Sequence, residues 1–334
     1  MKKVAINGFG RIGRLVFRIL EGEKDFEVVA INDLTNASQL AYLLKYDTSH
    51  RNYLENEISH QDDYLIVKDK KIKVFAKKDP LEIPWHELNV DLVFECTGYF
   101  TDLEKASSHI KAGAKKVLIS APAKGDLKTI VFNVNHQILD GSETVISAAS
   151  CTTNCLAPTV DLLDKEYGIE IGYMTTIHAY TNDQATLDIA HPKGENSRRG
   201  RAAAANIVPS STGAASAIGL VKPNLKGKLD GFALRVPTTT GSVIDLVLQL
   251  KTKTTKEMIN QLFEKNQNET IKITYDPIVS SDIIGSKYGA VVDGQLTSVL
   301  ETDQKQFVKV VAWYDNEFGY SAQMVRVAKY WLDL

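Results

Sequence analysis

The stretch KKVAINGFGRIGRLVFRILEG, residues 2–22, decides the fold of the first half of the chain. Its short apolar run VAI predicts a buried strand, and the apolar residues after the glycines recur at helical spacing. Between them, Gly8, Gly10 and Gly13 follow the G-x-G-x-x-G spacing. In a strand–turn–helix unit the first glycine permits the tight turn, the second lets a pyrophosphate approach the backbone, and the third lets helix and strand pack closely. The stretch therefore predicts a Rossmann-type dinucleotide-binding unit.

An acidic residue stands where this unit needs one. The next β-rich run, FEVVAIND, ends at Asp33, 20 residues after Gly13. A carboxylate at this position accepts hydrogen bonds from a ribose and repels a 2′-phosphate. We therefore expect NAD rather than NADP as the cofactor.

The pattern changes near residue 150. Before it, strands alternate with helical segments, which favours a parallel sheet covered on both faces. After it come long runs rich in Thr, Val and aromatic residues, such as LDGFALRVPTTTGSVIDLVLQL. We expect an α/β protein with a Rossmann-type NAD-binding domain over residues 1–150. An α+β catalytic domain with a large mixed, mainly antiparallel sheet would follow over residues 151–316.

Composition narrows the class of protein. Charged residues make up 24% of the 334 residues and the net charge is −2, so nothing implies a nucleic acid or an anionic membrane as partner. No apolar run approaches the roughly 20 residues that a membrane-spanning helix needs, and the start of the chain does not resemble a signal peptide. Three cysteines in so long a chain do not form a disulfide framework. We expect a reduced, soluble, cytoplasmic enzyme or binding protein.

Cys151 and Cys155 stand four apart in SCTTNC. A disulfide between them would need an oxidising compartment, and a structural zinc site would need about four ligands, which no paired Cys/His cluster completes. We therefore predict no metal site. Two interpretations remain open, a pair of buried structural thiols or a nucleophile with a bystander. Cys151 at the first turn of a helix would have its thiolate stabilised by the helix N-terminus.

His178 and several anion-binding candidates lie further along the chain. His178 sits in the strand-like run MTTIHAYTND, where a histidine is more often a core residue than a catalyst. Next to a thiol it would act as general base and then as general acid, but the sequence does not show that the two touch. The candidates for binding anions are Thr181, Thr212, Gly213, Arg235 and the arginines of SRRGR, among them Arg199. A solvated loop or a subunit contact is the alternative for those arginines.

Ten motifs in order along the chain carry a family resemblance: INGFGRIGR, INDL, LLKYDT, SAPAK, SCTTNCLAP, TIHAYTNDQ, STGAA, GKLDG, RVPT and WYDNEFGY. Together they resemble the phosphorylating glyceraldehyde-3-phosphate dehydrogenases over essentially the whole chain. SCTTNC combined with WYDNE is highly specific for that family and its close relatives.

The resemblance implies a role for each matching residue. Cys151 would be the nucleophile, His178 its base and acid, and Cys155 a bystander. The substrate's phosphate would be held by Thr181 and Arg235, and inorganic phosphate by Ser150, Thr152, Thr212 and Gly213, with Arg199 close by. The implied cofactor-binding residues are Gly8, Gly10, Arg11, Ile12, Gly13, Asp33, Lys78, Thr97, Ser120, Asn316 and Tyr320.

The resemblance also implies an activity and an assembly. The expected enzyme is a glycolytic, NAD-dependent oxidoreductase. It would convert D-glyceraldehyde 3-phosphate and inorganic phosphate to 1,3-bisphosphoglycerate through a cysteine thiohemiacetal and thioester. It would be a homotetramer, with the loop of residues 180–203 at a subunit contact and the C-terminal helix, residues 317–334, returning to the first domain. Two alternatives remain: an erythrose-4-phosphate-type dehydrogenase on the same scaffold, or a non-catalytic NAD-binding interaction protein.

Overall fold

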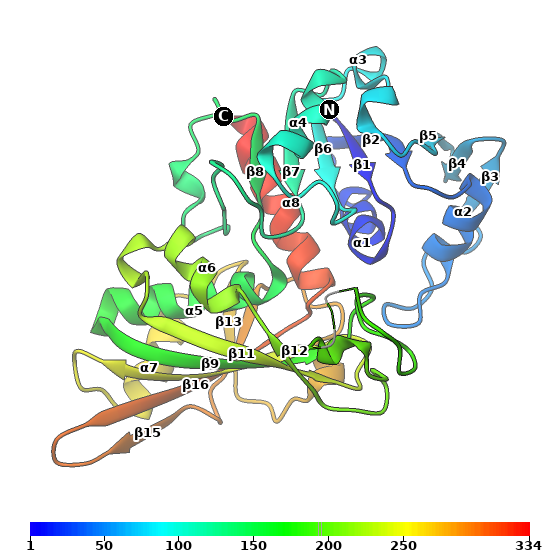
Figure 1. Ribbon diagram of the computed structural model, residues 1–334. Coiled ribbons are helices and arrows are strands. Elements are labelled where there is room, and N and C mark those ends of the chain that lie inside the picture. Colours follow the sequence, from blue (N-terminus) through cyan, green and yellow to red (C-terminus); the bar gives the residue numbers. More distant parts are fainter. Residues whose placement is uncertain (193, 195) are drawn as a thin grey trace. The chain divides into compact units, whose positions relative to one another are not determined.

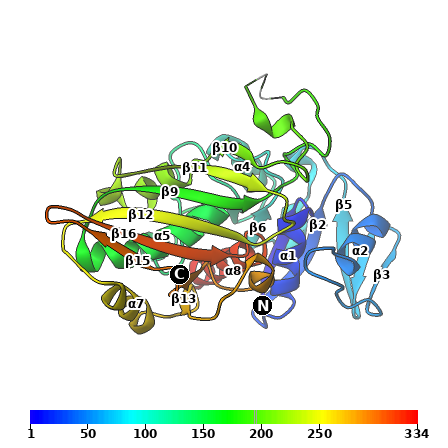
Figure 2. The ribbon, with the colours of Figure 1, turned by 90° about the horizontal axis from the view of Figure 1, so that it is seen from below.

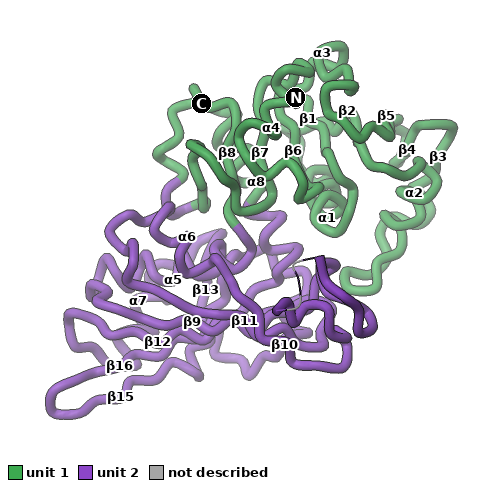
Figure 3. Tube along the Cα trace, in the orientation of Figure 1, with its two compact units in different colours: residues 1–132, 136–149, 324–334 green, residues 133–135, 150–323 purple. Residues whose placement is uncertain are grey.

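The computed structural model of the chain describes every residue except 193 and 195 (Figure 1). These two residues fall in the predicted subunit-contact loop, so that part of the prediction lies outside the described residues. The chain divides into two compact units, coloured separately in Figure 3. Unit 1 contains Met1–Phe132, His136–Ala149 and Met324–Leu334, and unit 2 contains Asn133–Asn135 and Ser150–Gln323. Within the described part, no helix is long and apolar enough to cross a membrane.

Unit 1 is built on an eight-stranded sheet in the order β3-β4-β5-β2-β1-β6-β7-β8. The six strands from β5 to β8 in this order run parallel, and this is the order of a doubly wound dinucleotide-binding sheet. β4 and β3 extend the sheet as an antiparallel edge. The strands are β1 (Lys2–Asn7), β2 (Phe26–Asn32), β3 (Ile58–Gln61), β4 (Tyr64–Val67), β5 (Lys70–Phe75), β6 (Leu92–Glu95), β7 (Lys116–Ile119) and β8 (Val145–Ser147). The predicted Rossmann-type fold is confirmed.

The helices of unit 1 begin at residues suited to that place. Asn36 caps α2, since its side-chain oxygen accepts a hydrogen bond from the N–H of Gln39, and Asp102 caps α4 in the same way. α1 carries a buried apolar face that includes Leu15, Val16 and Phe17. The helices are α1 (Arg11–Leu20), α2 (Ala37–Lys45), α3 (Trp85–Leu88) and α4 (Leu103–Lys111), with short 3-10 helices at Pro80–Glu82 and His136–Ile138.

The last part of α8 (Phe318–Asp333) belongs to unit 1. Trp331 on this helix is fully buried. The Nζ atom of Lys116 lies 4.5 Å from the centre of the Trp331 ring and donates a hydrogen bond to the Trp331 carbonyl oxygen at 3.2 Å. A cation–π contact and a hydrogen bond thus attach the end of the chain to β7.

Unit 2 contains a mixed sheet in the order β10-β11-β9-β12-β16-β14-β13, with β15 paired to β16. Only the β9–β11 and β13–β14 pairs are parallel, so the predicted large, mainly antiparallel sheet is confirmed. The strands are β9 (Ile169–Ala179), β10 (Val208–Ser211), β11 (Leu229–Val236), β12 (Ser242–Leu250), β13 (Ile271–Thr274), β14 (Ala290–Asp293), β15 (Ser298–Glu301) and β16 (Gln306–Tyr314).

One face of this sheet is covered by helices, and Figure 2 shows its long strands lying side by side. Alternation along the strands separates the two faces. Met174, Leu246 and Val310 point to the covered, buried face, while Tyr173, Val247 and Lys309 occupy paired positions on the other face. The helices are α5 (Cys151–Tyr167), α6 (Ala214–Val221) and α7 (Lys256–Lys265), with 3-10 helices at Arg198–Gly200, Pro223–Leu225 and Ser280–Ile283.

Candidate active site

Cys151 is the first residue of helix α5. Ser150 caps this helix, and its hydroxyl oxygen accepts a hydrogen bond from the N–H of Thr153 at 3.1 Å. Just before it, Ala149 takes a left-handed backbone conformation with φ of 58°, which is uncommon for a residue with a side chain. This turn places Cys151 at the helix N-terminus, where the backbone N–H groups have no partner within the helix.

His178 lies against this cysteine. Its Nε2 atom is 3.4 Å from the Sγ atom of Cys151, and its Nδ1 atom is 2.6 Å from the carbonyl oxygen of Ala179. In the neutral tautomer with its hydrogen on Nδ1, the imidazole donates to this carbonyl oxygen, which only accepts. The lone pair of Nε2 therefore faces the thiol, which is the arrangement a general base requires. The contact that the sequence left open is present.

Arg235 reaches the same histidine from the neighbouring strand. Arg235 on β11 and His178 on β9 are paired in the parallel register, so their side chains leave the sheet on the same face. The Nη1 atom of Arg235 lies 3.0 Å from Nδ1 of His178 and donates to the Ala179 carbonyl and to the Thr181 hydroxyl, each at 3.0 Å. A fixed positive charge is thereby held beside His178, which in turn contacts Cys151.

Burial and this charge act on both members of the pair. Burial raises the pKa of the Cys151 thiol, while the charge of Arg235 and the hydrogen bonds from Thr152 lower it. Burial and the charge of Arg235 lower the pKa of His178 to about 3. The sequence argument considered only the helix N-terminus at Cys151. Removal from water opposes that effect because it disfavours the charged form.

Tyr314 is a site residue that the sequence analysis missed. Its buried hydroxyl is 2.9 Å from the Thr152 hydroxyl and 2.8 Å from that of Thr176. The Thr152 hydroxyl, a predicted phosphate ligand, is thus already held by a partner. Tyr314 stands two residues before Asn316 in WYDNE, and this period-2 spacing is the only signal in the sequence that places both on the same side.

The Asp183 carboxylate links Thr181 to Arg199, and Arg235 contacts the same Thr181 hydroxyl. The Thr181 hydroxyl and the Arg199 guanidinium both bond to Asp183, another residue that the sequence analysis did not select. The Nε atom of Arg235 is buried without a hydrogen-bond partner among the described residues. A buried guanidinium with a free donor is suited to an anionic ligand.

Thr212 and Gly213 lie at the start of helix α6. The Thr212 hydroxyl oxygen accepts a hydrogen bond from the N–H of Ala214 at 3.2 Å, and Gly213 is the capping residue of the helix. No described contact joins either residue directly to Cys151. Cys155 is fully buried one turn into α5, where its Sγ donates to the carbonyl oxygen of Ala312 at 3.7 Å. All three cysteines are free thiols.

In unit 1 a pocket of about 650 Å³ opens above the glycine turn. It is lined by Asn7, Gly8, Gly10, Asn32, Asp33, Leu34, Lys77, Lys78, Cys96, Thr97, Tyr99 and Phe100. Gly8 has φ of 89°, and a Cβ atom on it would lie 2.7 Å from the N of Thr97. A Cβ on Gly13 would lie 2.1 Å from the Gly8 carbonyl, whereas one on Gly10 would meet nothing within 4 Å. The turn therefore requires Gly8 and Gly13, and the space at Gly10 is open to a ligand.

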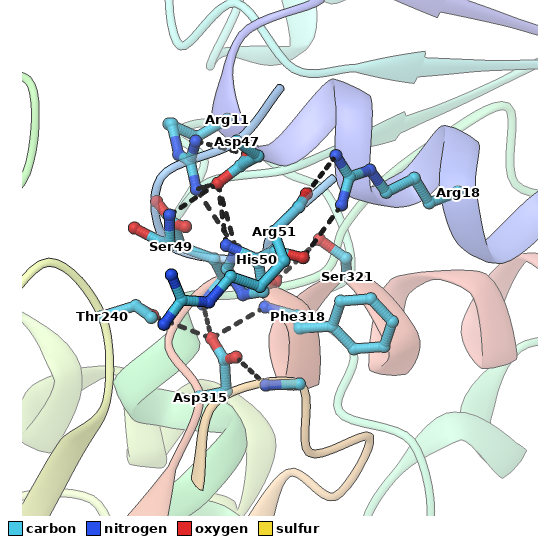
Figure 4. A network of polar contacts seen from close by, with 12 residues as sticks. Arg11, Arg18, Asp47, Ser49, His50, Arg51, Thr240, Asp315, Phe318 and Ser321 are labelled. Atoms are coloured by element: carbon cyan, nitrogen blue, oxygen red, sulfur yellow. Dashed lines mark hydrogen bonds and ion pairs between the residues drawn. The ribbon is translucent and has the colours of Figure 1, made fainter. Parts of the chain in front are cut away.

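Other predicted cofactor residues surround this turn. Ile12 lies in the first turn of α1, and the N–H of Ser120 donates to the Glu95 carbonyl at 2.9 Å just after β7. The guanidinium of Arg11 forms a fork with the Asp47 carboxylate at 2.6 and 3.1 Å (Figure 4). The bonds from Arg11 and the N–H of His50 hold the pKa of Asp47 at about 2 against the opposing effect of burial. The Arg11 side chain is thus committed to Asp47.

Asn316 and Tyr320 belong to unit 2. The side-chain oxygen of Asn316 accepts hydrogen bonds from the N–H of Gly241 at 3.1 Å and the hydroxyl of Ser242 at 2.8 Å. Next to it, Asp315 caps the start of α8 by accepting from the N–H of Phe318 at 2.9 Å (Figure 4). Tyr320 is buried in α8.

Comparison with known proteins decides the family. The family model for the glyceraldehyde 3-phosphate dehydrogenase NAD binding domain matches residues 2–103, and the model for its C-terminal domain matches residues 150–316. The chain belongs to the glyceraldehyde-3-phosphate dehydrogenase family. Curated members with this name from Clostridium pasteurianum and Clostridium acetobutylicum are 57% and 56% identical over 330 residues, which are 99% of this chain and 98% of theirs. The member from Streptococcus pyogenes is 53% identical over 329 residues, 98% of this chain and 97% of its own.

The dehydrogenase match confirms the predicted family, the enzyme class and NAD as the cofactor. The residues of unit 1 fit this cofactor. The glycine turn leaves room at Gly10, α1 begins directly after it at Arg11, and Asp33 directly follows β2. Among the residues that the structure describes, no group of three or more His, Cys, Asp or Glu side chains is placed to hold a metal ion.

Proposed function

We propose that the chain oxidises and phosphorylates D-glyceraldehyde 3-phosphate with Cys151 as nucleophile and His178 as its base and acid. The observation that carries the proposal is the 3.4 Å contact between Sγ of Cys151 and Nε2 of His178. The nucleophile stands at a helix N-terminus, the base is held by a third group, the Ala179 carbonyl, and an arginine lies beside both. This is the geometry of an activated nucleophile.

The reaction follows from these positions. As Sγ attacks the aldehyde carbon, the thiol proton passes to Nε2 of His178. The oxyanion of the thiohemiacetal is stabilised by protonated His178 and by the backbone N–H of Cys151 at the start of α5. NAD, when bound, supplies the hydride acceptor that converts the thiohemiacetal to a thioester. Phosphate oxygen then attacks the thioester carbon, the C–S bond breaks, and the acyl phosphate leaves Cys151 free.

Two anion sites beside the thiol are part of the proposal. Thr181 and Arg235 would hold the substrate's own phosphate, for which Arg235 has a buried Nε–H without a partner in the described chain. Ser150, Thr152, Thr212 and Gly213 would hold inorganic phosphate, with Arg199 nearby. Orienting a nucleophile beside the carbon it attacks can lower a barrier by about 7–11 kcal/mol in favourable cases.

The cofactor cradle would comprise residues 1–150 together with helix 317–334, and residues 151–316 would carry the chemistry. Gly8, Gly10, Gly13 and the N–H groups of Arg11 and Ile12 would receive the pyrophosphate, and Asp33 the adenosine ribose. Lys78, Thr97 and Ser120 would line the cleft. Because the oxygen of Asn316 already accepts hydrogen bonds, its side-chain NH₂ group remains to bind the nicotinamide amide, with Tyr320 packed nearby.

We further propose the predicted homotetramer and a cytoplasmic location. The uncovered face of the unit 2 sheet carries exposed apolar side chains on neighbouring strands, namely Ile171, Tyr173, Phe232, Val247, Leu300 and Phe307. A contiguous apolar face of this kind favours a subunit contact. Three free thiols favour a reducing compartment. Light scattering after size-exclusion chromatography tests the assembly, and a monomeric mass would refute it.

An assay of NADH formation from glyceraldehyde 3-phosphate, with and without phosphate, tests the reaction. Sustained turnover that requires phosphate or arsenate is the expected result, with a single burst of about one NADH per site in their absence. Full turnover without either anion would instead show hydrolysis of the acyl-enzyme, the behaviour of the erythrose-4-phosphate type.

A further inference from the structure

Three neighbouring parallel strands of unit 1 end in buried polar residues. β1 ends at Asn7, β2 at Asn32 and β6 at Glu95, and the register pairs Asn7 with both of the others. None of the three is more than 4% exposed. They form a row across the carboxyl edge of the sheet, where doubly wound folds bind their ligands.

Hydrogen bonds connect this row into one network. Nδ2 of Asn7 donates to Oε2 of Glu95 at 2.5 Å, and Nδ2 of Asn32 donates to Oδ1 of Asn7 at 2.7 Å. Asn32 in turn bonds both the N–H and the carbonyl of Lys77, each at 2.9 Å. Asn7, Asn32 and Lys77 all line the 650 Å³ pocket.

Glu95 also holds the opposite wall of the pocket. Its Oε1 atom accepts from the N–H of Thr97 at 2.8 Å and from the Thr97 hydroxyl. The Thr97 hydroxyl oxygen accepts from the N–H of Tyr99 at 3.1 Å. Thr97 and Tyr99, which both line the pocket, are therefore linked to this carboxylate, Thr97 directly and Tyr99 through the Thr97 hydroxyl.

A third residue, His109, donates to Glu95 from the buried core. The indole N–H of Trp85 can only donate, and it lies 3.1 Å from Nδ1 of His109, so that nitrogen accepts. The ring hydrogen of His109 is then on Nε2, which lies 3.0 Å from Oε2 of Glu95. Glu95 thus accepts four hydrogen bonds and donates none. Because it can only accept, it fixes which way the Asn7 and Asn32 amides point.

We propose that Glu95 is a positioning residue for the dinucleotide: it sets the floor and one wall of the NAD pocket without touching the cofactor. This inference rests on the proposed assignment of that pocket to NAD. A neutral Glu95→Gln side chain of the same shape presents an NH₂ group where two donors already point. If the NH₂ group takes the place of Oε1, Thr97 loses its acceptor. If it takes the place of Oε2, Asn7 and His109 lose theirs.

The test is the affinity of the full-length protein for NAD, measured by titration calorimetry. We expect Glu95→Gln to raise the Kd about fivefold or more, the factor at the lower end of what a buried donor left without its acceptor costs. Thr97→Val removes only the hydroxyl that Glu95 holds and should raise the Kd by a smaller factor. If Glu95 acts partly through Thr97, the two effects on the Kd are not independent. Adding Thr97→Val to Glu95→Gln then raises the Kd by a smaller factor than Thr97→Val raises it in the parent. In steady state the KM for NAD should rise while kcat at saturating NAD stays within about twofold.

Asp91→Asn is the matched control. Asp91 directly precedes β6 at its other end and accepts hydrogen bonds from the N–H of Lys3 at 2.8 Å and from Lys115 at 2.7 Å. The Asp91→Asn variant should unfold at a lower temperature in the absence of NAD but bind NAD with an unchanged Kd.

Asp33→Ala tests the assignment of the pocket to NAD. If this variant binds NAD with an unchanged Kd, the assignment fails and the inference with it. If Asp33→Ala weakens binding while folded Glu95→Gln binds NAD within twofold of the parent, the inference alone is overturned. Should Glu95→Gln fail to fold, an unchanged Kd for Thr97→Val overturns it.

Discussion

Arg235 and His178 occupy paired positions on the parallel strands β11 and β9, and Nη1 of Arg235 lies 3.0 Å from Nδ1 of His178. The register of the sheet therefore places a permanent positive charge beside the imidazole that faces the Cys151 thiol. An arginine stays protonated throughout the range in which a thiol titrates, so its effect on the thiolate has a single sign at every working pH.

Replacing Arg235 by leucine should make Cys151 a weaker acid. The charge of Arg235 lowers the pKa of the Cys151 thiol, so its removal raises that pKa and reduces the thiolate fraction at neutral pH. The rate of alkylation by iodoacetamide, followed against pH, should have its midpoint at higher pH than in the parent. Arg201→Leu, which removes an exposed arginine paired with Asp188, is the control and should leave the midpoint in place. A midpoint moved to lower pH would contradict the role given to Arg235.

His178→Asn should reduce kcat by about 10²–10⁴-fold, the usual contribution of general acid–base catalysis. The variant retains a side chain that can donate to the Ala179 carbonyl, so the sheet around it should persist. Stopped-flow measurement of the first NADH burst reports the step directly, and calorimetry should show unaltered NAD binding. A burst at the parent rate would mean that another group takes the thiol proton.

Removing the cap of the active-site helix should affect stability and activity together. Ser150→Ala loses the bond to the N–H of Thr153, which typically costs about 1 kcal/mol, and frees the turn that presents Cys151. Thr255→Ala is the matched control, because Thr255 caps α7 in the same way through the N–H of Met258. Both variants should unfold at a lower temperature, and only Ser150→Ala should lose kcat. Equal activities would show that the cap does not orient the nucleophile.

Asp33 should control the choice between the two dinucleotides. Its Oδ2 atom accepts from the N–H of Phe9 at 2.8 Å, so the carboxylate is fixed at the edge of the glycine turn. Asp33→Ser removes a charge that repels a 2′-phosphate, and the ratio of kcat/KM for NADP to that for NAD should rise about tenfold or more. A ratio that does not rise would place the ribose elsewhere.

Local sequence predicts those parts of this molecule that local physics determines. Gly8 and Gly13 were recognisable because only glycine fits a turn with so little room, and Asp33 because it directly follows the next strand. Cys151 could be placed at a helix start, but its contact with His178 joins residues 27 apart in the sequence and depends on the fold of the sheet. Before the structure, the position of Cys151 at a helix start favoured it as the nucleophile, and the family resemblance implied that Cys155 is a bystander.

The missed residues share one physical cause. Tyr314 reaches Thr152 across 162 positions of sequence, and Glu95 meets Asn7 across 88, because strand order and register bring them together. Neither strand order nor register can be deduced from the local sequence of these residues. Asp183 was not selected either, although it stands two residues after Thr181 and links Thr181 to Arg199.

The central claim is that Cys151 carries the acyl group. The most direct measurement is mass spectrometry of peptides from enzyme quenched after mixing with glyceraldehyde 3-phosphate and NAD in the absence of phosphate. The account predicts a phosphoglyceroyl group on the peptide that contains Cys151, assigned to Cys151 by fragmentation and absent from Cys151→Ser. An NADH burst without that group on Cys151, or with the group on Cys155 or Cys96, would contradict it.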